Sequence, residues 1–325
     1  MKLSEIVSLI KKREMFMFRS KDEYFQIAGQ LNKNSEVIYQ IIIRITNKCN
    51  INCEYCFIKS TEYSKYDKKI ESTINKLKDL DLDGSFVILS GGEPTIHPKY
   101  QEYVNKLRES NASLITQTNA ILFSNNNFKN KIDLSNHRFF VSLPSAIKEN
   151  YNKITNSNLF EKAIAGVYNL SLSNKTEINF VIYRENCYEL PLLVDLIKTK
   201  FNYKNMLLRI SNLGIVDKSN SKIQFERYSK IIPMYKNIFE NENDFRIELT
   251  IGGGCGLPIC VCNKITKIDQ EYMFLADTNS ISFNKLEKQY YKNSKCNNCS
   301  YDKYCQGFVK EYIEEFGDGE INPIH

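Results

Sequence analysis

Three cysteines directly behind a buried strand constrain this chain more than any other feature of its sequence. Cys49, Cys53 and Cys56 follow the apolar segment Ile38–Ile45 with the spacing C-x3-C-x2-C. Three thiolates on a tight loop can hold three corners of a four-iron cluster and leave the fourth iron open to a substrate or cofactor. A structural zinc site is the alternative, but it is almost always closed by four ligands. The next histidine is His97, so the spacing favours the open cluster.

The ten cysteines are themselves unevenly distributed. Nine fall in two clusters, Cys49–Cys56 and Cys255–Cys305, and only Cys187 stands alone. Charged residues interrupt Met1–Phe18 before an apolar core forms, and no apolar stretch is long enough to cross a bilayer. We therefore expect a cytoplasmic protein without membrane partners, in which disulfides rarely persist and clustered thiols indicate metal binding or catalysis. With three histidines, thiolate-only sites suited to iron–sulfur clusters or zinc are favoured.

The net charge of +6 is mild for 325 residues. Lysine and arginine are scattered among aspartate and glutamate, which is typical of a mixed, solvated surface and does not predict a nucleic-acid partner.

Short apolar runs alternate with segments of helical periodicity through the middle of the chain, which predicts βαβ units and a parallel sheet. The predicted strands are Ile38–Ile45, Phe86–Leu89, Leu114–Thr116, Phe139–Leu143, Ile178–Tyr183 and Met206–Ile210; the predicted helices are Ile70–Leu80, Tyr100–Leu107, Leu159–Leu172, Leu190–Thr199 and Ile223–Phe239. A short helix and hairpin are expected before Ile38.

A second motif, Ser90-Gly91-Gly92-Glu93-Pro94, stands at the end of the second predicted strand. A ligand over the carboxyl end of a parallel sheet lies at such a place, and glycines let backbone groups approach it closely. Alone, this run could be a strand-to-helix turn. One strand–helix unit after the three-cysteine loop, it is far more specific.

With both motifs in place, the chain resembles the radical S-adenosylmethionine (radical SAM) superfamily over about Ile38–Gly214. That resemblance implies an α/β fold, a partial (β/α)6 TIM-like barrel, with S-adenosylmethionine and an open 4Fe–4S cluster held by Cys49, Cys53 and Cys56. It also implies an electron donor of flavodoxin or ferredoxin type. The implied cofactor-binding residues are Tyr55, Ser90, Gly91, Gly92, Glu93, Thr118, Asn119, Ser142 and Arg209, with Ala120 standing where many members have glycine.

The C-terminal cysteines resemble the SPASM and twitch extensions of radical SAM maturases. Their core, C-x2-C-x5-C-x-G, is matched by Cys296, Cys299, Cys305 and Gly307, but Val309 stands where the full SPASM pattern has a further cysteine. Six thiols are too few to ligate two more clusters fully, so one auxiliary 4Fe–4S cluster is expected. Cys260 is the preferred fourth ligand and Cys255 and Cys262 compete with it; a zinc knuckle is the alternative.

Thiols left without a metal could donate hydrogen to a substrate radical. Cys187, Cys255 and Cys262 are the candidates for such a catalytic role, although Cys187 also reads as a small buried apolar residue. The expected domains are a prefix over 1–36, the barrel over 37–222, a connecting helix over 223–250 and a small metal-cluster domain over 251–325.

These features together predict a radical SAM enzyme that abstracts hydrogen from a ribosomally made peptide, leading to crosslinking, epimerisation or oxidation. A small-molecule oxidoreductase or cofactor-biosynthesis enzyme using the same radical is the second hypothesis. A non-catalytic iron–sulfur or zinc protein that binds nucleic acid is the third, and it would leave Gly91–Pro94 without a role. No segment resembles a separate leader-binding module, so leader recognition is expected to be direct or supplied by a partner.

Overall fold

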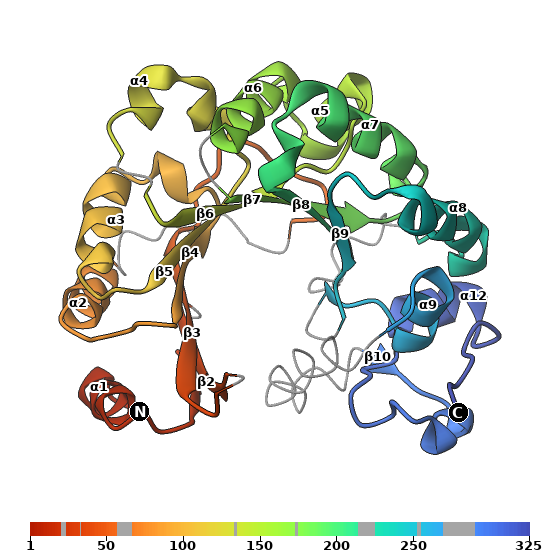
Figure 1. The fold of residues 1–325 in the computed structure, drawn as a ribbon, viewed down its shortest axis with the longest axis horizontal. Coiled ribbons are helices and arrows are strands. Elements are labelled where there is room, and N and C mark those ends of the chain that lie inside the picture. The colour runs from red at the N-terminus through yellow and green to blue at the C-terminus, as the bar shows by residue number, and fades with distance from the viewer. Residues whose placement is uncertain are drawn as a thin grey trace. The chain divides into compact units, whose positions relative to one another are not determined.

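The computed structural model describes most of the chain (Figure 1). The described residues are 1–20, 24–32, 34–56, 67–132, 135–172, 175–213, 225–251, 255–268 and 290–325. They divide into two compact units. The first comprises Met1–Asn52, Ile58–Ser142 and Ser157–Glu177, and the second comprises Cys53–Phe57, Leu143–Asn156 and Ile178–His325.

The first unit contains the beginning of the sheet and the helices that pack on it. Its elements are α1 (Leu3–Lys11), β1 (Met17–Arg19), β2 (Phe25–Leu31), β3 (Val37–Thr46), α2 (Asp67–Leu77), β4 (Phe86–Gly91), α3 (Tyr100–Arg108), β5 (Ser113–Thr118), α4 (Asn126–Lys129), β6 (His137–Ser142) and α6 (Phe160–Ser171). The first residues form a helix followed by an antiparallel β1–β2 hairpin, whereas their separation as a prefix over 1–36 stays a prediction. Because β2 also pairs antiparallel with β3, the hairpin extends the sheet.

Strands β3 to β6 pair in parallel, each with the next. Helices α2 and α3 lie side by side along this part of the sheet (Figure 1). Residues on alternate positions of β3, such as Ile41 and Ile43, are fully buried, whereas Gln40 is exposed and Arg44 half-buried. One face of β3 is therefore buried, whereas the other, with Ile38, Gln40, Ile42 and Arg44, is partly exposed and mixed in character.

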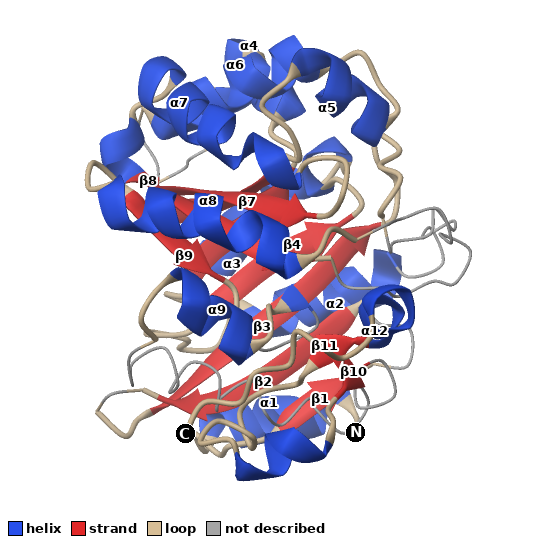
Figure 2. Ribbon diagram, turned by 90° about the vertical axis from the view of Figure 1, so that its right-hand side faces the viewer, coloured by secondary structure: helices blue, strands red, loops and turns tan. Residues whose placement is uncertain are grey.

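The second unit carries the remaining strands and the C-terminal cysteines. Its elements are α5 (Lys148–Thr155), β7 (Lys175–Ile182, which begins in the first unit), α7 (Leu190–Lys200), β8 (Met206–Asn212), α8 (Tyr228–Asn241), β9 (Arg246–Leu249), α9 (Ile259–Ile265), β10 (Tyr290–Tyr291), β11 (Phe308–Val309) and α12 (Lys310–Phe316). Strands β8 and β9 are parallel, and β10 and β11 form a short antiparallel pair next to α12 (Figure 2).

The predicted fold class is confirmed. Strands β1 to β9 follow chain order across one mostly parallel sheet, the strand arrangement of a partial α/β barrel. Five predicted helices and six predicted strands are present, with ends that shift by a few residues. The predicted helix Ile223–Phe239 begins only at Tyr228, and its first two residues lie outside the described part. The predicted boundaries near residues 222 and 251 adjoin undescribed segments and stay predictions.

A close backbone approach between α6 and the turn after β5 generates the first testable prediction. A Cβ atom at Gly166 would lie 1.9 Å from the carbonyl oxygen of Ala120, and backbone cannot move aside as a flexible side chain can. We expect Gly166→Ala to lower the free energy of unfolding by about 1–3 kcal/mol, despite the better helix propensity of alanine. Urea unfolding measures it.

The matched control is Gly319→Ala, since a Cβ there has nothing within 4 Å. Its effect should stay within about 0.5 kcal/mol. Equal effects at the two glycines would contradict the packing argument.

Candidate functional site

The glycine pair at the end of β4 packs directly against the loop that carries Cys49. The N–H of Gly92 donates to the carbonyl oxygen of Thr46 (2.7 Å), and the N–H of Glu93 donates to that of Lys48 (2.8 Å). A Cβ atom at Gly91 would lie 2.0 Å from the Thr46 oxygen, and one at Gly92 would lie 2.2 Å from the Lys48 oxygen. Gly91 also has φ +136°, which side chains rarely adopt. Glycines are therefore required at both positions for the two backbones to touch.

Glu93 is fully buried and accepts four hydrogen bonds. Its Oε1 accepts from the Thr95 N–H (3.1 Å), the Thr95 hydroxyl (2.6 Å) and the Thr118 hydroxyl (2.7 Å), and its Oε2 accepts from the Asn119 N–H (2.7 Å). Burial raises the pKa of Glu93, whereas these hydrogen bonds lower it. Because every partner donates, the arrangement suits the carboxylate. The side chain thus joins the ends of β4 and β5 and does not point to solvent.

Asn119, which follows β5, lies beside the first cysteine. Its Nδ2 is 3.9 Å from the Cys49 sulfur and donates to Asn50 Oδ1 (2.6 Å). Ala120 has φ +62°, in the left-handed region that glycine adopts without strain. That conformation gives a physical reason to expect glycine at this position. The structure therefore brings Glu93, Thr118 and Asn119 together next to Cys49.

The segment Cys53–Cys56 is anchored within the second unit. The N–H of Glu54 donates to the carbonyl oxygen of Ile154 (2.9 Å), and the hydroxyl of Tyr183 donates to Glu54 Oε1 (2.5 Å). The rings of Tyr55 and Tyr183 meet edge to face with centroids 5.6 Å apart. Burial, followed by the Glu54 carboxylate, raises the pKa of Tyr183, so its hydroxyl keeps its proton. Sequence analysis missed Tyr183, since no local pattern pairs it with Glu54.

The three remaining predicted cofactor-binding side chains have different surroundings. Ser90 on β4 donates to Gln117 Oε1 (2.5 Å), and Ser142 lies half-buried at the end of β6. Arg209 on β8 pairs with Glu248 of β9 at 3.0 Å. Glu248 also pairs with Arg246, so its single negative charge is shared between two arginines.

A further buried acid, which the sequence analysis did not single out, holds the loop after β6. Glu189 Oε2 accepts from the Ser145 hydroxyl (2.6 Å) and the Ala146 N–H (2.9 Å), and its Oε1 accepts from Asn150 Nδ2. Glu189 is only 6% exposed. It fixes the path of the chain just beyond Ser142, where the carboxyl end of the sheet borders a ligand site in this fold class.

Four of the C-terminal thiols lie within electrostatic reach of one another. Burial raises the pKa of Cys260, and the neighbouring Cys296 and Cys299 raise it further. Burial also raises the pKa of Cys296, and it raises the pKa of Cys305 to about 11, with Cys260 adding to the latter shift. The β10–β11 pair brackets the loop that carries three of these cysteines. Thiols from α9 and from this loop thus influence one another electrostatically, without three of these described thiols converging on a single metal ion.

The candidate hydrogen donors differ in access. Cys262 is fully buried near Cys260 and Cys305, and Cys187 is 1% exposed with its thiol directed at the carbonyl oxygen of Arg184 (3.8 Å). Burial raises the pKa of Cys187 to about 12. Cys255 is exposed. The burial of Cys187 favours its reading as a small apolar residue.

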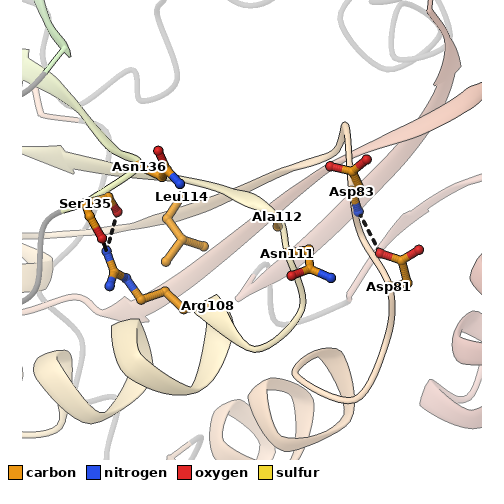
Figure 3. Close-up of a pocket in the computed structure, with 8 residues that line it drawn as sticks. All are labelled: Asp81, Asp83, Arg108, Asn111, Ala112, Leu114, Ser135 and Asn136. Atoms are coloured by element: carbon orange, nitrogen blue, oxygen red, sulfur yellow. Dashed lines mark hydrogen bonds between the residues drawn. The ribbon is translucent and has the colours of Figure 1, made fainter.

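One hollow lies away from all of these residues (Figure 3). It has a volume of about 590 Å³ and is lined by Asp81, Asp83, Arg108, Asn111, Ala112, Leu114, Ser135 and Asn136. Apart from Arg108, which ends α3, these residues stand at or just before the amino-terminal ends of β4, β5 and β6. In barrels of this type, that end serves stability and the carboxyl end serves chemistry.

No three histidine, cysteine, aspartate or glutamate side chains in the described part converge closely enough to hold a single metal ion. Among the helices described, none has the length and apolar character to span a membrane.

The first barrel strand leads into a loop with three cysteines, and the start of this loop packs on the glycine pair that follows the next strand. In a parallel α/β domain, this combination defines a class of cluster-binding enzyme domains. Residues 43–189 match the family model described as the Radical SAM superfamily, and this part of the chain is a radical SAM domain. The predicted S-adenosylmethionine and 4Fe–4S cluster are the cofactors of that family.

The similar proteins are curated sequence relatives and solved structures with a similar fold. The Fe-coproporphyrin III synthase of Methanosarcina barkeri is 26% identical over 52% of this chain and 43% of its own length. A probable GTP 3′,8-cyclase of Saccharolobus islandicus is 28% identical over 47% of this chain and 51% of its own length. The chain thus spans about half the length of these curated relatives. Streptococcus suis SuiB bound to precursor peptide SuiA shares the fold, with a TM-score of 0.55 over 98% of this chain and 79% of SuiB, at 14% identity.

The hydrogen bonds of Glu93 generate the second testable prediction. Glu93→Gln would turn an NH2 group toward a donor, either the Asn119 N–H or the Thr95 and Thr118 hydroxyls. We expect it to lower the free energy of unfolding by about 2–3 kcal/mol, because a buried charge-assisted set is broken. Thermal unfolding of the apoprotein measures it.

The control is Glu71→Gln, which removes a carboxylate paired with Lys99 near the surface at 2.8 Å. Its expected effect is below about 1 kcal/mol. A Glu93→Gln protein as stable as the control would rule out the proposed role of Glu93.

Proposed function

We propose that this protein is a radical SAM enzyme that modifies a ribosomally made peptide and carries two iron–sulfur clusters. The observation that carries the proposal is the contact between the Gly91–Gly92 pair and the backbone leading to Cys49. The chain also has a second set of cysteines near its C-terminus. The curated relatives and SuiB support the proposal that this protein cleaves S-adenosylmethionine. The proposal that its substrate is a peptide is more specific and is argued separately below.

The residues at the first centre have distinct proposed tasks. Cys49, Cys53 and Cys56 bind three irons and leave the fourth for the cofactor. The donor set fits this group, because the loop is short, its thiols are exposed or half-buried, and Asn119 Nδ2 approaches the Cys49 sulfur. When bound there, the reduced cluster would supply the electron for cleaving S-adenosylmethionine into methionine and a 5′-deoxyadenosyl radical, the species that would remove hydrogen from the substrate.

The cofactor is held by groups at the carboxyl ends of the strands. We assign the backbone of Gly91–Glu93 to the amino end of its methionine part and Ser142 to its ribose. Tyr55, Ser90, Thr118 and Asn119 complete this proposed set. Arg209 was predicted to face the cofactor carboxylate; because it shares the single charge of Glu248 with Arg246, a cofactor carboxylate at Arg209 would complete the charge balance there.

The second centre is proposed as one auxiliary 4Fe–4S cluster on Cys260, Cys296, Cys299 and Cys305. Soft thiolates with no imidazole among them are the donors that iron–sulfur clusters take. Buried thiols with raised pKa values lose their protons when they bind a metal, so burial is no obstacle to ligation. Cys255 is then the accessible thiol for hydrogen donation, because a donor must reach the substrate radical and Cys187 and Cys262 are buried.

The peptide substrate is supported by likeness to SuiB, a protein solved with a precursor peptide, over nearly the whole of this chain. The second candidate is a small-molecule reaction, favoured by the curated relatives, which include a GTP cyclase and a porphyrin-forming enzyme. An electron donor of flavodoxin or ferredoxin type would serve either reaction.

Cofactor cleavage is the third testable prediction. Anaerobically reconstituted protein with S-adenosylmethionine and dithionite should form 5′-deoxyadenosine, and it should hold about eight irons per chain. Cys53→Ala should abolish the product and leave about four irons. The control, Cys187→Ala, should retain both. A filled cluster that forms no 5′-deoxyadenosine would refute the enzymatic part of the proposal.

The peptide substrate is the fourth prediction. Incubation with short peptides encoded next to this gene should change the mass of one of them by the loss of two hydrogens, or add deuterium from heavy water without other change. The first result indicates a crosslink or oxidation and the second indicates epimerisation. Turnover of a nucleotide or porphyrin precursor with unchanged peptides would favour the second candidate.

A further inference from the structure

Residues 318–325 follow α12 and contact two of the four cysteines proposed as auxiliary-cluster ligands, Cys260, Cys296, Cys299 and Cys305. We call these four cysteines the C-terminal thiol group and residues 318–325 the strap. Asp318 Oδ2 accepts from Asn293 Nδ2 (2.9 Å), and the carbonyl oxygen of Ile324 accepts from the N–H of Ser300 (2.8 Å). These contacts fix the strap along the loop that carries Cys296 and Cys299.

A second set of contacts fixes the middle of the strap. Glu320 accepts from the N–H of Ser229 at the start of α8 (3.1 Å) and from the hydroxyl of Tyr312 on α12. Ile321 is only 5% exposed. The strap is thus held to its surroundings at several points and does not hang in solvent.

Backbone N–H groups of the strap point at two of the proposed ligand sulfurs. The N–H of Ile324 donates to the Cys299 sulfur (3.4 Å). The N–H of Asn322 donates to Cys260 and lowers the pKa that burial raises. Pro323, between them, has no N–H to leave unpaired. Alternate residues of the strap therefore present their donors to the thiol group.

Backbone N–H groups outside the strap also donate to sulfurs of the C-terminal thiol group. The N–H of Gly307 lies 3.3 Å from the Cys305 sulfur, and the N–H of Ile259 also donates to Cys305. The N–H of Asn293 donates to Cys296, so all four proposed ligand sulfurs receive backbone hydrogen bonds. Gly307 has φ +90°, and a Cβ there would lie 2.2 Å from the Tyr291 carbonyl oxygen, so this position too is built for a close approach.

We propose that the strap sets the reduction potential of the auxiliary cluster through the N–H groups of Asn322 and Ile324. This inference rests on the auxiliary cluster of the proposed function. Hydrogen bonds to cluster sulfurs and the exclusion of water are the means by which a protein tunes such a potential. Each N–H dipole stabilises the more negative, reduced cluster, so its removal makes the potential more negative.

The test uses the full chain with Cys49, Cys53 and Cys56 changed to alanine, so that iron is held only by the C-terminal thiols. In this background, Ile324→Pro removes the N–H, whereas Ile324→Ala removes the side chain and keeps the N–H. We expect Ile324→Pro to shift the midpoint potential of the cluster to a more negative value, and Ile324→Ala to leave it nearly unchanged. Electron paramagnetic resonance (EPR) during redox titration measures both.

A second measurement keeps the fold intact. Protein labelled with ¹⁵N-isoleucine should show ¹⁵N coupling to the reduced cluster in pulsed EPR, from Ile259 and Ile324. Ile324→Val, which places unlabelled nitrogen there, should weaken that coupling.

The outcomes distinguish a failure of the auxiliary-cluster proposal from a failure of the proposed role of the strap. If the background protein holds no iron and sulfide, the auxiliary cluster fails and this inference with it. If the cluster is present but Ile324→Pro and Ile324→Ala have the same potential, or the ¹⁵N coupling is unchanged in Ile324→Val, the role of the strap is overturned and the two-cluster proposal stands.

Discussion

The contact between two backbones, at Gly91–Gly92 and at Thr46–Lys48, is the constraint on which the candidate site depends. Cys49 is the next residue after Lys48, whose carbonyl oxygen accepts from Glu93. The position of the first thiol is therefore fixed by the peptide groups of Gly92 and Glu93, directly after β4, which side-chain motion does not perturb. The two hydrogen bonds each contribute only about 1 kcal/mol of net stability. The absence of Cβ atoms at Gly91 and Gly92 is what allows the two backbones to approach closely enough to form them.

A ligand loop needs rigid support, because a site displaced by a fraction of an ångström loses its geometry. Buried polar side chains supply that support here. Glu93 gathers four donors at the ends of β4 and β5, and Tyr183 holds Glu54 in the segment that carries Cys53 and Cys56. Each is a high-stakes arrangement, since an unsatisfied partner in a buried site costs more than the bond contributes.

The sequence predicted the parts of this protein that local patterns encode. Apolar runs located β3 to β8, and cysteine spacing with the glycine motif located the radical SAM domain. It did not predict β9, a strand of four residues, or the pairing of Arg209 with Glu248 that depends on it. Tyr183 and Glu54 lie 129 positions apart, and no periodicity links them. Contacts of that kind are set by strand order and loop path, which only the folded chain reveals.

The part of the chain over residues 290–325 shows how a cysteine-rich segment with little regular structure can be stable. Its strands β10 and β11 have two residues each, and α12 has seven. Its apolar core is small, consisting of Tyr290, Phe308, Val309, Tyr312 and Ile321. A segment of this size seldom stabilises itself by apolar burial alone. Because a metal cluster binds the folded arrangement of thiols and not the unfolded chain, its binding free energy adds to the folding free energy. With the proposed auxiliary cluster bound, the N–H groups of the strap would contribute to both, since they meet the sulfurs only when the segment has folded around them.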